Sequence, residues 1–168
     1  TWSRFADDHR VAYETEPLGE PLVISGSGHV DLWLEPGTED TAVQVTLTEI
    51  RSDGLEQRVQ SGWHRPVHRA EDPAQSDDLR VDYTFTPDDR EPLVPGELIG
   101  FRVPFMPLAH VFRAGSRIRV GVSTPGRDMP LWCYDNPVTE GAVHEVGVGG
   151  TAASSLVLPV WDDPAHLL

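Results

Sequence analysis

Pro107-Leu-Ala-His-Val-Phe-Arg-Ala-Gly-Ser-Arg-Ile-Arg-Val-Gly-Val-Ser123 is the stretch that decides the fold. Its centre, Arg113-Ala-Gly115, predicts a tight turn, because glycine adopts positive φ without steric cost. After the turn, Ile118, Val120 and Val122 alternate with polar or small residues, a period of two that is typical of a strand with one buried face. Nothing in the stretch forms a catalytic pattern, so it indicates a fold and not a chemistry.

The same alternation recurs along the chain, and single Gly and Pro residues separate the apolar runs. No window of helical length keeps a period of 3.6 residues, so we expect about nine or ten short strands and no helix. Strands at intervals of about ten residues are typical of a two-layer β-sandwich, here a jelly roll. The expected strands cover residues 11–14, 22–24, 30–34, 42–48, 56–63, 79–85, 98–105, 117–123, 146–148 and 156–160.

Length and composition predict one soluble domain over residues 1–168, with a lead-in segment at 1–10 and a tail at 161–168. The net charge of −14 disfavours binding to nucleic acids and to anionic membranes. No apolar run approaches the length of a membrane span. The single cysteine, Cys133, excludes an internal disulfide and a cysteine-ligated metal site, and it favours a cytoplasmic location.

A search for catalytic and cofactor patterns gives no site, so we expect no catalytic residue, no metal and no cofactor. Gly121-Val-Ser-Thr-Pro125 is nearest to a nucleophile elbow, but Pro125 replaces the final glycine and no helix follows. His64 and His68 have a spacing that suits zinc on a helix, but Pro66 between them disfavours the helix.

The aromatic residues are the better candidates for binding. Trp33, Trp63, Trp132 and Tyr134 are candidates for a ligand site or a domain interface, with packing against the core as the alternative. Trp132 and Tyr134 belong to a long irregular segment, and residues 64–78 form another. Irregular segments of this length are uncommon in compact domains and often have a function, so we expect both to be contact regions.

Several segments in register, over about residues 12–160, resemble the C-terminal domain of X-Pro dipeptidyl-peptidases and cocaine-esterase-like hydrolases. The segments are Glu16-Pro-Leu18 with Leu22-Val-Ile-Ser-Gly26, Val30-Asp-Leu-Trp-Leu34, Gln60-Ser-Gly-Trp-His-Arg65 with His68-Arg69, Pro107 to Arg119, Asp135-Asn-Pro137 and Ser155-Leu-Val-Leu-Pro159. The resemblance implies a jelly roll related to galactose-binding domains. In that family the domain follows an α/β-hydrolase domain that carries a Ser-Asp-His triad, and no triad position falls within this sequence.

The resemblance implies that this chain alone is not catalytic and that its parent protein is a serine hydrolase for esters or amides. Its expected partner is the α/β-hydrolase domain of the same polypeptide, on which it packs and whose substrate pocket it shapes. Formation of a homo-oligomer is a further expectation. A free-standing carbohydrate-binding module is the alternative, and an independent metal-dependent enzyme is the least favoured. The chain begins at Thr1, which favours an excised piece of a longer polypeptide.

Overall fold

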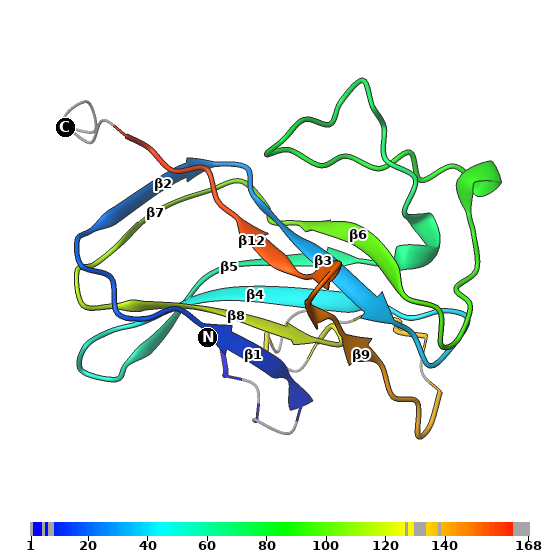
Figure 1. Ribbon diagram of the computed structural model, residues 1–168, viewed down its shortest axis with the longest axis horizontal. Helices are drawn as coiled ribbons and strands as arrows, with labels where there is room; N and C mark the ends of the chain where they lie inside the picture. Colours follow the sequence, from blue (N-terminus) through cyan, green and yellow to red (C-terminus); the bar gives the residue numbers. More distant parts are fainter. Residues whose placement is uncertain are drawn as a thin grey trace.

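The computed structural model describes residues 2–4, 6, 9–126, 128–129, 134–137 and 139–162. The described chain is built from β-strands and two short 3-10 turns, Pro66–His68 and Pro87–Asp89, and contains no α-helix (Figure 1). The strands are β1 (Val11–Glu14), β2 (Leu22–Gly26), β3 (His29–Glu35), β4 (Val43–Ile50), β5 (Glu56–His64), β6 (Ile99–Pro104), β7 (Leu108–Phe112), β8 (Arg117–Ser123), β9 (Glu145–Val146), β10 (Val148–Gly149), β11 (Ala152–Ala153) and β12 (Ser155–Val157).

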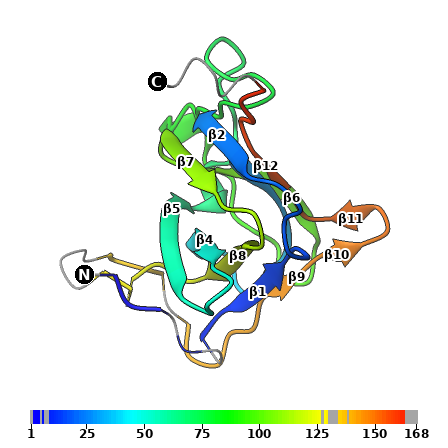
Figure 2. The same cartoon turned by 90° about the vertical axis from the view of Figure 1, so that its left-hand side faces the viewer.

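Two antiparallel sheets form the layers of a β-sandwich, seen end-on in Figure 2. The first sheet has the strand order β1-β8-β4-β5. The second has the order β12-β3-β6, and the short β9 also pairs with β3. A separate pair, β2 with β7, lies at one end of the sandwich, and β10 with β11 forms a hairpin. The predicted all-β sandwich is confirmed, while its relation to galactose-binding domains stays a prediction.

The core lies between the sheets because each strand places its alternate apolar residues on the inner face. From β8, the predicted Ile118, Val120 and Val122 are all buried in it. They meet apolar residues of β3, β4 and β6 and the fully buried Phe112 of β7. The other core residues are Ile24, Val30, Leu32, Leu34, Val43, Val45, Leu47, Phe101, Val103 and Phe105.

The prediction of a strand over 79–85 is wrong. This segment belongs to an irregular excursion over residues 65–98, in which Tyr83 forms only an isolated bridge with Glu71. Val81 and Tyr83 alternate with less buried residues because they pack onto the sandwich, with 7% and 8% of their surface exposed. Just before Val81, the Asp77 carboxylate accepts hydrogen bonds from two backbone N–H groups in a turn, and backbone hydrogen bonds to residues 70 and 72 flank the single bridge at Tyr83. Alternating burial therefore arises here with a single bridge and without a continuous strand ladder.

Gly62 is required where β5 approaches the end of β6. A Cβ at this position would lie 2.1 Å from the carbonyl oxygen of Pro104 and 2.9 Å from its carbonyl carbon. Because both atoms belong to the backbone, relief requires the two layers to move apart.

We expect Gly62→Ala to lower the free energy of unfolding by about 2 kcal/mol, measured by denaturant titration. Gly149→Ala is the matched control, since Gly149 also lies on a strand and its Cβ would meet nothing within 4 Å. Equal losses in the two variants would show that the close approach at Gly62 has no energetic importance.

Candidate functional site

Trp63 and Tyr134 lie together on the outer face of the first sheet. Their rings stack with centroids 5.9 Å apart and an interplanar angle of 25°. The Trp63 indole Nε1 donates a hydrogen bond to Gln44 Oε1 at 2.9 Å, and Gln44 Nε2 donates to Asp128 Oδ2 at 2.7 Å. Gln44 and Asp128 are fully buried, so the segment after β8 covers this part of the sheet. Trp63 therefore holds that segment against the sandwich.

Trp33 lies on the outer face of the second sheet, so the whole sandwich separates it from Trp63. Because side chains alternate along β3, Trp33 points away from the buried Leu32 and Leu34. Trp132 lies outside the described residues. The structure thus unites two of the four predicted aromatic residues and places the third on the opposite face.

His64 is buried at the end of β5 and packs against aromatic rings. It ends β5, is 5% exposed, and stacks on Tyr83 with ring centroids 3.9 Å apart. Burial is the main cause that lowers the pKa of His64 from 6.5 to about 4, and the nearby His68 contributes in the same direction. Among the described residues, no group of three or more His, Cys, Asp or Glu side chains is placed to hold a metal ion. The arrangement gives a neutral imidazole at pH 7.

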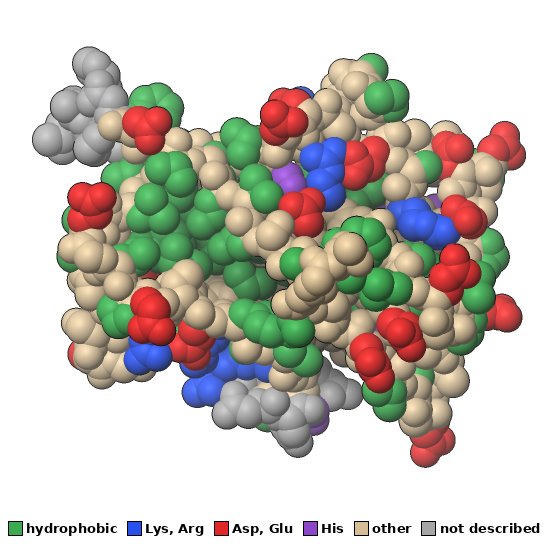
Figure 3. Space-filling view, viewed as in Figure 1, with side chains coloured by type: hydrophobic (Ala, Val, Ile, Leu, Met, Phe, Trp, Pro, Cys, Tyr) green, Lys and Arg blue, Asp and Glu red, His purple; other side chains and the backbone are tan. Residues whose placement is uncertain are grey.

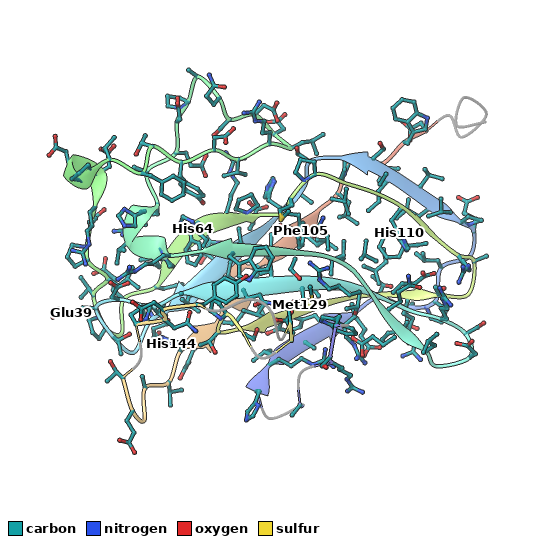
Figure 4. All side chains as sticks on the ribbon, turned by 180° about the vertical axis from the view of Figure 1, so that it is seen from behind. Glu39, His64, Phe105, His110, Met129 and His144 are labelled. Atoms are coloured by element: carbon teal, nitrogen blue, oxygen red, sulfur yellow. The ribbon has the colours of Figure 1, made fainter. Side chains whose placement is uncertain are left out.

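A buried carboxylate, Glu49, brings together a serine and a histidine at the other end of the sandwich. Ser116 Oγ donates to Glu49 Oε1 at 2.7 Å, and the ring Nε2 of His110 lies 3.1 Å from Glu49 Oε2. The backbone N–H of Arg113 donates to Oε1 at 3.0 Å. Both side chains bond to the carboxylate, so His110 does not act as a base toward Ser116. The cluster fixes the β7–β8 turn, and Figure 4 shows His110 and His64 at opposite ends.

The sandwich is open along one side, where β1 and β12 are the edge strands of the two sheets. Among the described strands, no ladder joins β1 to β12. Between them lies a hollow of about 100 Å³, lined almost entirely by apolar side chains from both sheets. Tyr13, Val120 and Leu156 are three of its lining residues. We call this side of the sandwich the open edge. It includes Tyr13 and Leu156, which line the hollow, and the half-buried Leu18, Leu22 and Leu158.

Figure 3 shows a broad hydrophobic area at the open edge, in the left half of the view between β2 and β12 above and β8 below. A contiguous apolar patch of this kind usually marks an interaction surface. The residues that form it were not predicted, because Leu22 and Leu156 have the same alternation as residues sealed in the core. The missing information is which two strands end their sheets, and that depends on the topology.

Comparison with known proteins identifies related chains. The family described as "X-Pro dipeptidyl-peptidase C-terminal non-catalytic domain" matches residues 2–157. A Mycobacterium bovis protein named "Putative serine esterase" is 28% identical over 119 residues, which cover 70% of this chain and 19% of that protein. A protein of the same name from Mycobacterium tuberculosis matches equally. This chain therefore spans about a fifth of the length of these curated relatives.

Solved structures share the fold. A CocE/NonD family hydrolase from Staphylococcus aureus aligns with a TM-score of 0.78 and 19% identity, over 92% of this chain and 31% of that chain. An alpha-amino acid ester hydrolase aligns with a TM-score of 0.70 and 23% identity, over 95% of this chain and 27% of that chain. In the part of the chain that the structure describes, no helix is long and apolar enough to cross a membrane.

Proposed function

The chain belongs to the X-Pro dipeptidyl-peptidase C-terminal non-catalytic domain family, and we propose that it packs on an α/β-hydrolase domain of the same polypeptide. In this role it shapes the substrate pocket of that domain and supplies no catalytic residue itself. The names of its relatives, "Putative serine esterase" and "alpha-amino acid ester hydrolase", support an ester as the substrate of the parent enzyme, and the peptidase in the family description supports an amide.

The observation that carries this proposal is the apolar open edge. Tyr13 is 40% exposed and lies beside Val120 and Leu156 at the mouth of the hollow. Covering these side chains removes apolar surface from water, which favours association by about 25 cal/mol per Å² before the cost of ordering.

The catalytic domain is the favoured occupant of the open edge because the relatives carry far more chain than this domain. The matched region makes up 19% of the curated relatives and 31% of the Staphylococcus aureus hydrolase. When two domains belong to one polypeptide, each is present near the other at a high effective concentration, so a small contact area is sufficient to keep them docked. A second copy of the chain is the competing occupant.

A charge placed at the open edge should release the domain from its partner. We expect Tyr13→Asp, in the polypeptide encoded by the source gene, to speed amide hydrogen exchange of β12 and of the opposing surface at least tenfold. A carboxylate at this position loses its hydration when the interface closes, which disfavours docking. Tyr13 lies on the edge strand β1, so the substitution does not open the core of the domain.

Val148→Asp is the matched control, because Val148 is 66% exposed on the β10 strand, away from the open edge. Unchanged exchange in Tyr13→Asp contradicts docking at this surface. Increased exchange that depends on protein concentration assigns the surface to a second copy instead. An immunoblot that finds a native product no longer than this chain contradicts the proposal as a whole.

A further inference from the structure

The outer face of the second sheet holds a hollow that docking at the open edge does not explain. Its volume is about 430 Å³, within the usual range for small-ligand pockets. Strands β3 and β6 form its floor, Glu71 of the 65–98 excursion lines one part, and Ala153 of β11 lines another. Figure 2 shows the β10–β11 hairpin projecting beyond the sheet on this side.

The indole of Trp33 lies flat on the floor of this hollow. A Cβ built on Gly100 would lie 3.1–3.2 Å from three atoms of the six-membered ring, Cη2, Cζ2 and Cζ3. Three nearly equal distances mean that Gly100 faces the plane of the ring and not its edge. Trp33 pairs with Gly100 across the β3–β6 ladder, and because Gly100 has no side chain, the indole lies flat over the β6 backbone. The other ring face is directed away from the sheet.

Fixed polar groups surround the indole. Arg102 donates from Nε to Glu71 Oε1 at 2.8 Å, donates again to the second carboxylate oxygen, and donates from a terminal nitrogen to the carbonyl of Asp77. Asp31 accepts a hydrogen bond from Ser155 Oγ at 2.9 Å, and the ring of the buried His29 lies 3.3 Å from its other oxygen. These interactions hold the side chains in place before a ligand arrives, which reduces the ordering cost of binding.

The remaining hydrogen-bonding capacity of these groups defines the ligand. Arg102 uses three of its five N–H groups in the contacts above, which leaves two donors. Asp31, Glu71 and Ser155 retain lone pairs as acceptors. A hydroxyl group both donates and accepts at one oxygen, so a ligand rich in hydroxyls satisfies both kinds of group. An anion would meet two carboxylates, and a cation would leave the Arg102 donors unused.

We infer that this hollow binds a neutral saccharide, with the apolar face of a sugar ring on Trp33 and its hydroxyls on Asp31, Glu71, Arg102 and Ser155. Trp33 supplies a large, rigid apolar surface that loses little conformational entropy on binding. The inference does not rest on the docking proposal, because it concerns the outer face of the second sheet. It gives the domain a binding function of its own.

The test is a calorimetric titration of the native protein with maltose, cellobiose and lactose, and with choline and gluconate as charged probes. We expect at least one sugar to bind and both charged probes to be inert. Trp33→Ala should weaken sugar binding at least tenfold, and Trp33→Phe, which keeps an aromatic ring, should weaken it less.

Trp63→Phe is the matched control, because Trp63 lies on the opposite face, and its affinity for the sugar should equal that of the wild type. Circular dichroism of each variant establishes that the fold is intact. If Trp33→Ala does not fold, the shift of the Trp33 indole N–H signal in wild-type spectra replaces it as the readout. Absence of binding by every sugar, binding of choline or gluconate instead, or loss of binding in Trp63→Phe overturns the inference.

Discussion

Glu49→Ala is expected to lower the free energy of unfolding by about 4 kcal/mol. Glu49 is 1% exposed, and its carboxylate accepts hydrogen bonds from Ser116 Oγ and the Arg113 N–H and contacts the His110 ring. Removing the carboxylate leaves these groups without a partner in a buried place and creates a cavity. Burial raises the pKa of Glu49, but the hydrogen bonds from Arg113, Ser116 and His110 outweigh it and hold the pKa below its usual value.

Denaturant titration at pH 7 measures the loss. Glu97→Ala is the control, because Glu97 is exposed, and it should change stability by no more than about 0.5 kcal/mol. Glu49→Gln keeps the shape but turns an amide N–H₂ toward donors, so we expect about half the loss of the alanine variant. A loss below about 1 kcal/mol in Glu49→Ala would mean that water replaces the carboxylate and that the cluster does not fix the β7–β8 turn.

The domain is expected to lose about 3 kcal/mol of stability through His64 alone as the pH falls from 7 to 4. Burial lowers the pKa of His64 from 6.5 to about 4 in the folded chain. Below pH 6.5 the unfolded chain takes up a proton at this ring, while the folded chain does not until about pH 4. Each unit of difference corresponds to 1.36 kcal/mol, and above pH 6.5 neither state binds the proton, so the contribution is constant there.

The measurement compares the wild type with His64→Phe, because other groups also titrate in this range. Phenylalanine keeps a ring against Tyr83 and has no proton to gain, so the stability difference between the two proteins should shift by about 3 kcal/mol between pH 7 and pH 4. The His68 charge and the Glu71 carboxylate act on this ring in opposite directions, and both are retained in the variant. An NMR titration of the His64 ring with a midpoint near 6.5 would contradict the prediction.

Alternation of apolar residues predicted the sandwich because a strand exposes its side chains to two different environments. Ile118, Val120 and Val122 entered the core as expected, and Trp33 turned outward. The same signal failed at Val81 and Tyr83, where the alternation comes from packing of an irregular segment and not from a ladder. Periodicity reports which side chains are buried, and it does not report whether the backbone is paired.

Neither the open edge nor the hollow at Trp33 could be predicted from the sequence. Trp33 and Trp63 were singled out together as aromatic residues, but their strands belong to different sheets and face opposite directions. The Arg102–Glu71 ion pair joins residues that are 31 positions apart, on β6 and on the excursion, and no spacing in the sequence indicates it. The open edge exists because β1 and β12 each pair with a described strand on one side only and so end their sheets.

The sequence by itself determined the fold class, the positions of most strands and the membership in a non-catalytic domain family. Those properties depend on local alternation and on motifs, both of which can be read along one chain. Only the tertiary structure decided which strands are edges, which aromatic faces remain open and which carboxylates are buried. These features depend on pairing between segments far apart in the chain. The free energy gained by packing selects that pairing, and the local conformational preference of each segment does not.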